Sequence, residues 1–197
     1  MRKGKTFIIC GPSGVGKGTV VARLMASDPT LYFSVSATTR EPRPGEIDGK
    51  HYHFLTQEQF DEWVKEGMFL EHAEFVGNRY GTPRQFIDKA MEQGRDVILD
   101  IEIQGAEQVH QKRPDVVRIF IAPPSWDELE RRLIGRGTED MDKVRSRLQR
   151  GKDEFMVASN FDYFVINDTV DRAVEEISAI MCAEHCKPDE RIAMINR

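Results

Sequence analysis

Residues 11–19 read Gly11-Pro12-Ser13-Gly14-Val15-Gly16-Lys17-Gly18-Thr19 and directly follow the apolar run Thr6–Cys10. This order predicts a strand that runs into a glycine-rich turn and then into a helix. Glycines let several backbone N–H groups converge on one anion, the lysine adds a mobile positive charge, and the helix adds the positive end of its dipole. An ordinary strand–helix turn is the alternative, but the glycines and the lysine together favour a phosphate-binding loop.

The loop departs at one position from the general pattern G-x-x-x-x-G-K-[ST]. Gly18 follows the lysine, and the hydroxyl comes one residue later, on Thr19. In the general pattern that hydroxyl contacts a magnesium ion. We therefore expect Thr19 to be the nearest hydroxyl, with phosphate oxygens, water and Asp100 supplying more of the coordination of Mg²⁺.

The composition is that of a globular protein. The 197 residues are 40% hydrophobic and 31% charged, which allows one sizeable domain with a smaller insert. The net charge of −5 argues against a surface built for nucleic acid or anionic membranes. No apolar run approaches the ~20 residues that span a bilayer, and the N-terminus lacks a signal-peptide cleavage region. We expect a cytoplasmic protein with neither nucleic-acid nor membrane partners.

The three cysteines do not suggest a disulfide framework. Cys10 lies in the first predicted strand and is most simply a small buried residue. Cys182 and Cys186 are one helical turn apart beside His185, which leaves a metal site as the alternative to a plain helix end. Because no further Cys/His cluster completes four ligands, we favour the helix end.

Short apolar runs alternate with helical patterns, which predicts an α/β fold with a largely parallel sheet. The runs lack clean polar alternation, as expected when helices cover both faces of a sheet. The predicted strands are Thr6–Cys10, Phe33–Ala37, Asp96–Ile101, Val116–Ala122 and Tyr163–Ile166.

Helix starts are marked by hydroxyl side chains. Thr56 and Ser125 each fit a capping box, in which the hydroxyl and a side chain three residues later satisfy unpaired N–H groups. Thr82 fits the same pattern with proline at the first helical position, and Gly94 is placed to end that helix. The last long helix is predicted over Val170–Cys186, stopping near Pro188.

Several motifs resemble guanylate kinases. Ser34–Gly49 is similar to the acceptor-site signature of that family. Further matching stretches are Phe69–Glu71, Gly77–Thr82, Leu99–Gly105, Ile121–Ser125, Gly135–Gly137 and Val165–Asp168. The motifs come in the family's order, and the resemblance covers nearly the whole chain.

The resemblance implies a P-loop kinase three-layer fold with a central parallel sheet. It implies a guanylate kinase-like domain over residues 4–186 and a C-terminal tail, 187–197, that could pack on the core, mediate self-association or be disordered. The sequence leaves a homo-oligomer open. Within the domain we expect a core of residues 4–35, 92–130 and 148–186, a GMP-binding insert over 36–91, and an arginine-rich lid over 131–147.

The implied reaction is Mg²⁺-dependent transfer of the ATP γ-phosphoryl group to GMP, or to dGMP, in purine nucleotide metabolism. The predicted ATP-binding residues are Gly11, Pro12, Ser13, Gly14, Val15, Gly16, Lys17, Gly18, Thr19 and Asn167. The predicted GMP-binding residues are Ser36, Arg40, Arg43, Tyr52, Glu71, Tyr80, Thr82, Asp100 and Glu102. The predicted catalytic cations are Lys17, Arg136 and Arg147, and Asp100 (through water) and Thr19 are the expected Mg²⁺ contacts.

The chemistry of these residues supports the roles that the resemblance assigns to them. Guanidinium and hydroxyl groups donate good hydrogen bonds to phosphate oxygens. Taken one by one, however, the arginines could equally be surface charges, and the tyrosines could be partly buried packing residues. A carboxylate at Glu71 matches the two neighbouring N–H donors of guanine. The alternative is that Glu71 simply belongs to an exposed helix-to-strand edge. Asp100 ends a buried strand, where phosphate-loop enzymes hold Mg²⁺. Glu102 follows where the family often has Asp, which leaves a contact to the base or to metal-bound water open.

Two other functions compete. One is a non-catalytic guanylate-kinase-like module that binds phosphopeptides, against which the intact loop and the lid arginines argue. The other is a related small-molecule kinase, for example one that phosphorylates a ribose bisphosphate, which would have no use for Glu71 and Thr82 as base contacts.

Overall fold

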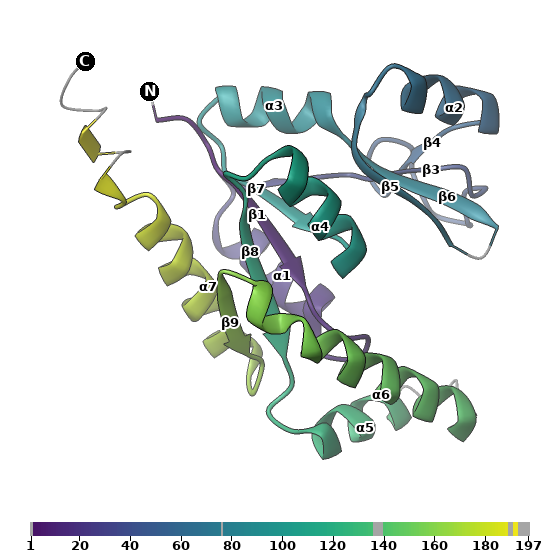
Figure 1. Ribbon diagram of the computed structural model, residues 1–197, viewed down its shortest axis with the longest axis vertical. Helices are drawn as coiled ribbons and strands as arrows, with labels where there is room; N and C mark the ends of the chain where they lie inside the picture. The colour runs from purple at the N-terminus through teal and green to yellow at the C-terminus, as the bar shows by residue number, and fades with distance from the viewer. Residues whose placement is uncertain (1, 76, 136–139, 189–190, 193–197) are drawn as a thin grey trace. The chain divides into compact units, whose positions relative to one another are not determined.

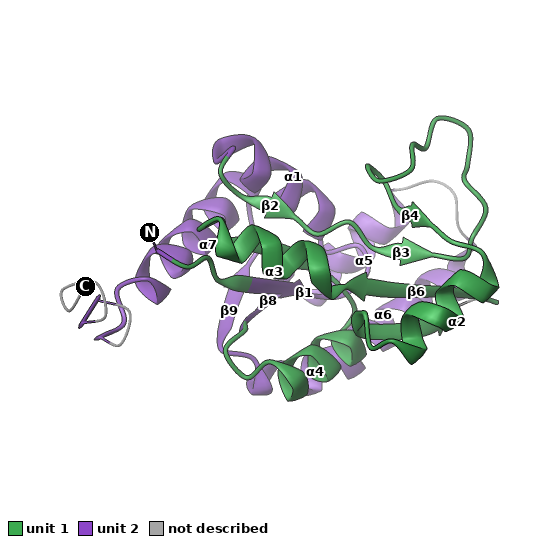
Figure 2. Ribbon diagram, turned by 90° about the horizontal axis from the view of Figure 1, so that it is seen from above, with its two compact units in different colours: residues 1, 3–6, 30–116 green, residues 2, 7–29, 117–197 purple. Residues whose placement is uncertain are grey.

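The chain forms two compact units within an α/β fold. The computed structural model describes residues 2–75, 77–135, 140–188 and 191–192. The first unit comprises residues 3–6 and 30–116, and the second comprises residues 7–29 and those from 117 onward (Figure 2). The strands belong to a five-stranded sheet in the order β2-β7-β1-β8-β9 and a four-stranded sheet in the order β4-β3-β6-β5. The predicted α/β fold with a central parallel sheet is confirmed.

Parallel strands form the centre of the second unit: β1 (Thr6–Cys10) pairs with β8 (Val117–Ala122), which pairs with β9 (Tyr163–Ile166) (Figure 1). All of β1 is buried, which explains its unbroken apolar run. The helices are α1 (Lys17–Ser27), α5 (Trp126–Ile134), α6 (Met141–Met156) and α7 (Val170–Glu184), with a 3₁₀ turn at Ala158–Asn160. No helix of the described residues combines the length and apolar character that a membrane span requires.

The first unit contributes β2 (Tyr32–Phe33) and β7 (Val97–Asp100), which pair in parallel. Its antiparallel hairpin is β5 (Phe69–Phe75) and β6 (Asn78–Pro83), and it continues through β3 (Ala37–Thr38) to β4 (His53–Phe54). The helices are α2 (Gln57–Lys65), α3 (Arg84–Glu92) and α4 (Ile103–Lys112). Phe60 and Phe69 stack in a small core of their own under this hairpin, with ring centroids 4.6 Å apart.

The prediction of one strand over Phe33–Ala37 is wrong. The chain leaves the parallel sheet after Ser34, whose N–H donates to the Ile98 carbonyl at 3.0 Å. Three residues later Ala37 pairs in antiparallel fashion with Gly81 in the four-stranded sheet. One short apolar stretch therefore serves two sheets, because pairing partners distant in sequence decide where each strand lies.

The helix starts are confirmed in part. Thr56 forms the complete capping box that its sequence predicts. Ser125 accepts from the Glu128 N–H, but the Glu128 carboxylate contacts arginine side chains. Thr82 is not a cap, because its hydroxyl donates to Glu71, and α3 begins at Arg84 after the N-cap residue Pro83. Helix α7 ends at Glu184, two residues before the predicted end.

Candidate functional site

The glycine-rich loop lies between β1 and α1, as predicted. Gly16 is the N-cap of α1 and has a left-handed φ of 94°, and a Cβ there would lie 2.7 Å from the Asn167 amide nitrogen. The cap therefore requires glycine both for its backbone conformation and for space. Among the described residues no side chain caps α1, and its first turn contains no acidic residue, so its N-terminal N–H groups suit an anion.

The residues of the loop differ in exposure. Pro12, Gly14 and Val15 are buried, Lys17 is half-buried, and Ser13, Gly18 and Thr19 are exposed. The hydroxyls of Ser13 and Thr19 are thus accessible to a bound phosphate or ion, and the buried residues fix the backbone between them.

A buried amide braces this loop from the end of β9. The Asn167 side chain is 2% exposed, and its Nδ2 donates to the Val15 carbonyl at 2.7 Å. Arg132 adds two bonds of 3.0 Å each, from Nη1 to the Val15 carbonyl and from Nη2 to the Asn167 carbonyl. Arg132 is in turn paired with Glu128 at 2.8 Å. Arg132 is not among the residues predicted from the sequence, although its i,i+4 spacing from Glu128 is a readable signal of this pair.

Of the two predicted lid arginines, one is seen near the loop. Arg147 Nη1 lies 3.5 Å from the Ser13 hydroxyl oxygen, so α6 brings a guanidinium to the exposed side of the loop. Arg136 lies outside the described residues. Of the three predicted catalytic cations, Lys17 and Arg147 are therefore the two that lie among the described residues, and both belong to the second unit.

The first unit holds the predicted base-binding carboxylate. Glu71 on β5 is 8% exposed, and the Thr82 hydroxyl of β6 donates to its Oε1 at 2.5 Å. Burial raises the pKa of Glu71 above its ordinary value, and the Thr82 hydrogen bond and the charge of Lys112 oppose that rise. No ion pair among the described residues includes Glu71, so its hydrogen-bonding partner within the unit is a neutral hydroxyl.

The first turn of α4 approaches Glu71 closely at Gly105. A Cβ at Gly105 would lie 2.9 Å from Glu71 Oε2 and 3.1 Å from its Cδ. The carboxylate therefore occupies space that any other residue at position 105 would fill. This role of Gly105 depends on a contact between α4 and β5, which local sequence patterns do not show.

Arg40 is surrounded by predicted phosphate ligands. Its guanidinium carbon lies 5.4 Å from the centre of the Tyr52 ring, and the Tyr52 and Tyr80 rings are 6.1 Å apart. The carboxylate of Glu46 binds Arg40 at 2.8 Å, a partner that the sequence analysis did not identify. One guanidinium and two phenol rings are thus assembled on neighbouring strands and loops.

The remaining predicted residues of this unit lie in two places, beside β3 and at the end of β7. Ser36 is half-buried immediately before β3, and Arg43 is exposed in the following loop. Asp100 is half-buried at the end of β7, and Glu102 is the exposed N-cap residue of α4. Asp100 and Glu102 therefore flank the turn from β7 into the helix that approaches Glu71.

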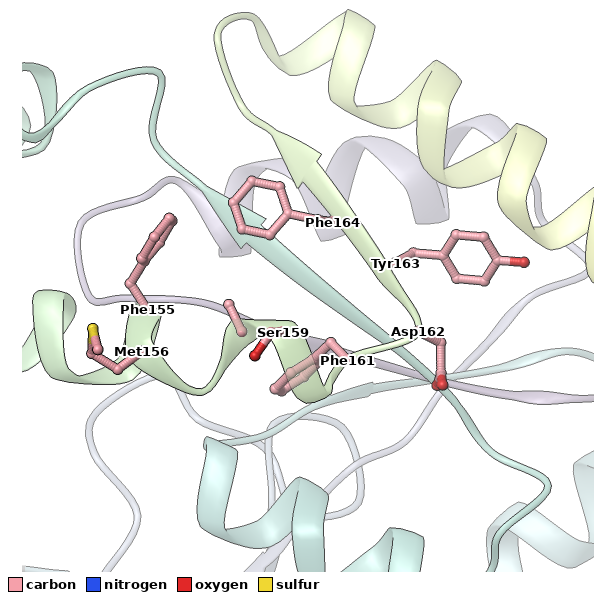
Figure 3. A pocket seen from close by; sticks show the side chains of 8 residues that line it. Phe155, Met156, Ser159, Phe161, Asp162, Tyr163 and Phe164 are labelled. Atoms are coloured by element: carbon pink, nitrogen blue, oxygen red, sulfur yellow. The ribbon is translucent and has the colours of Figure 1, made fainter.

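A hollow elsewhere in the second unit has a different chemistry. It has a volume of about 510 Å³ beside the end of α6 and strand β9 (Figure 3). Aromatic rings dominate its wall, and Phe155 and Phe164 meet edge to face with centroids 5.7 Å apart. None of the described residues that line it is basic. It is therefore poorly suited to a polyphosphate.

Comparisons with known proteins agree with this geometry. The sequence model of the guanylate kinase family matches residues 3–184. The chain is 47% identical over 190 residues to a guanylate kinase of Lactococcus lactis subsp. lactis (strain IL1403), covering 96% of this chain and 93% of that one. It is 48% identical over 193 residues to a guanylate kinase of Bacillus anthracis, covering 98% of this chain and 94% of that one. The crystal structure of guanylate kinase from Anaplasma phagocytophilum matches with a TM-score of 0.74 at 34% identity, covering 95% of this chain and 89% of that one. The chain belongs to the guanylate kinase family.

Proposed function

We propose that this chain transfers the γ-phosphoryl group of ATP to GMP, giving ADP and GDP, within purine nucleotide metabolism. The observation that carries the proposal is the buried Glu71 carboxylate, whose hydrogen-bonding partner in the unit is the Thr82 hydroxyl. A buried carboxylate with unused acceptors is destabilising unless a ligand supplies donors. Guanine supplies two, at N1–H and at the exocyclic amino group.

Base selection follows from this pairing. Adenine would place an unprotonated ring nitrogen against the Glu71 carboxylate, and a buried mismatch of this kind costs about 1–3 kcal/mol for each lost bond. Thr82 fixes the carboxylate and adds a hydroxyl contact to the base. Because dGMP carries the same base, it is an expected acceptor as well.

The acceptor phosphate is proposed to bind Ser36, Arg40, Arg43, Tyr52 and Tyr80. Arginine forks make paired, charge-assisted hydrogen bonds to phosphate oxygens, and phenol hydroxyls add neutral donors. The packing of Arg40 against Tyr52 supports this assignment, because it places a guanidinium and a phenol side by side, where both can contact one phosphate.

The donor ATP is proposed to bind the second unit. Backbone N–H groups of the glycine-rich loop, apart from Pro12, which has none, and the Lys17 ammonium hold its phosphates, and Arg147, with Arg136 of the proposed lid, stabilises charge on the transferred group. Asn167 Oδ1 is buried and has no hydrogen-bond partner within the described structure, which suits a donor such as the adenine amino group. A direct in-line transfer needs chiefly positioning and charge neutralisation.

The donor set also suits Mg²⁺. The Asp100 carboxylate and the Thr19 hydroxyl are hard oxygen ligands, as this ion prefers. Among the described residues no three His, Cys, Asp or Glu side chains gather as a ligand cluster. We therefore propose an ion that is held largely by phosphate oxygens and water, with Asp100 contributing through water. When bound, Mg²⁺ neutralises phosphate charge and orients the phosphates.

The proposed moving parts are the insert over 36–91 and the lid over 131–147, of which residues 76 and 136–139 lie outside the described part of the structure. Their closure would exclude water and so prevent wasteful ATP hydrolysis. The phosphopeptide-binding module and the small-molecule kinase remain the competing functions. The small-molecule kinase would have no use for Glu71 and Thr82. The phosphopeptide-binding module would have no use for the uncapped N-terminus of α1 or for Lys17.

A coupled assay with Mg-ATP and GMP, dGMP, AMP and a ribose phosphate as separate acceptors tests the proposal. We expect rapid ADP formation with GMP and dGMP and little with the other acceptors. Turnover of the ribose phosphate alone would support the competing kinase, and no turnover with any acceptor would leave the binding module as the better account.

A further inference from the structure

Residues 43–46 form a turn that the sequence dictates. Pro44 and Gly45 occupy its central positions, and Gly45 has a φ of 88°, as a type II turn requires. The Glu46 N–H donates to the Arg43 carbonyl at 3.0 Å. The Arg43 N–H donates to Glu46 Oε2 at 2.8 Å. Backbone and side chain thus tie the two ends of the turn, which fixes the Glu46 carboxylate within the loop.

The same carboxylate holds the guanidinium of Arg40. Arg40 Nη2 donates to Glu46 Oε1 at 2.8 Å and to Oε2 at 2.9 Å, and the two side chains are only 15% and 18% exposed. Hydrogen bonding to Arg40 lowers the pKa of Glu46, and the same bond raises the pKa of Arg40. Both groups therefore stay ionised at neutral pH.

Other contacts fix the remaining edges of this guanidinium. Arg40 Nη1 donates to the Glu41 carbonyl at 2.7 Å, and the Tyr52 ring lies across one face with its centroid 5.4 Å away. Hydrogen bonding with Tyr80 also contributes to the raised pKa of Arg40. A guanidinium has five N–H donors, and Glu46, the Glu41 carbonyl and Tyr80 together use up to four of them. The orientation of Arg40 is therefore set while at least one donor remains for another anion.

We propose that Glu46 is a positioning residue of the acceptor-phosphate subsite. It holds Arg40 directly, and Arg43 through the turn, in the arrangement that receives the phosphate of GMP, and it stays in place when the nucleotide binds. This inference rests on the proposed function.

The rival role for Glu46 is a placeholder that occupies the position of the phosphate and leaves when GMP arrives. The doubly tied turn favours the positioning role. Leaving would break the bond to the Arg43 N–H as well as the pair with Arg40.

The test compares Glu46→Gln with Glu41→Gln, an exposed carboxylate in the same loop that provides the same change of charge. Steady-state kinetics give KM for GMP and for ATP, and calorimetry gives Kd for GMP and for guanosine, which has no phosphate. We expect Glu46→Gln to raise KM and Kd for GMP about tenfold or more. KM for ATP and the binding of guanosine should change less than about twofold, which separates positioning from general loss of folding. Glu41→Gln should resemble the wild type.

A double-mutant cycle shows whether Glu46 acts through Arg40. In an Arg40→Met background, Glu46→Gln should change KM for GMP clearly less than in the wild-type background, because only the tie to Arg43 remains to be lost. Tighter GMP binding by Glu46→Gln would establish the placeholder and overturn the proposal, and so would an undiminished tenfold effect without Arg40. If the wild type fails to phosphorylate GMP, the proposed function fails. If the wild type is active and Glu46→Gln behaves like it, only this inference fails.

Discussion

The contact between Gly105 and Glu71 allows a sharp prediction for Gly105→Ala. The new Cβ would lie 2.9 Å from Glu71 Oε2, about 0.5 Å short of the 3.4 Å at which ordinary contact begins. Thr82 holds the other oxygen at 2.5 Å, so the carboxylate would have to move or tilt against that bond. Misaligning one charge-assisted hydrogen bond to guanine costs about 1.5–3 kcal/mol, which corresponds to about 10- to 150-fold in kcat/KM for GMP.

The same substitution should not harm the helix itself. Alanine is favoured over glycine within helices by up to about 1 kcal/mol, so α4 gains intrinsic stability as the site loses activity. Thermal unfolding and kcat/KM for GMP are measured on Gly105→Ala, with Gln104→Ala as the exposed control on the same turn. Unchanged kcat/KM for GMP in Gly105→Ala would refute the claim that this glycine makes room for the carboxylate.

Three further predictions concern the two nucleotide sites. Lys17→Ala should lower kcat by at least about 100-fold, because it removes a cation from the transferred phosphate, while circular dichroism shows an intact fold; near-normal turnover would contradict the role of the loop. Burial raises the pKa of Glu71, so kcat/KM for GMP should fall with acid while the pH is still above the ordinary range for a glutamate, as the carboxylate is protonated. A pH–rate profile of Glu71→Gln, which should lack this limb, separates it from titration of the GMP phosphate. Asn167→Ala removes one of two bonds to the Val15 carbonyl, and Arg132 still donates to it, so the variant should lower stability by about 0.5–1.5 kcal/mol and raise KM for ATP but not for GMP; an equal rise in both KM values would argue against a local brace.

Local patterns predicted the elements whose causes are local. The strand Thr6–Cys10, the loop and the start of α1 follow from an apolar run, glycines and a helix N-terminus that are adjacent in sequence. Thr56 caps α2 as its capping box predicts, since both partners lie within three residues.

Distant contacts account for what the sequence could not predict. Thr82 looks like a cap, but its hydroxyl bonds to Glu71 eleven residues earlier on the paired strand. Arg132 braces Val15, which is 117 residues away in sequence. Glu46 is a local partner of Arg40, yet nothing in the spacing alone distinguishes it from an ordinary exposed glutamate in a loop.

Selection of guanine by Glu71 is measured by the ratio of kcat/KM for GMP to kcat/KM for AMP. We expect the wild type to prefer GMP by about 100-fold or more, as two mismatched buried hydrogen bonds imply. In Glu71→Gln the ratio should shrink at least about tenfold, chiefly through loss of GMP turnover. A wild type that uses both nucleotides equally, or a Glu71→Gln variant that keeps the wild-type ratio, would contradict the account.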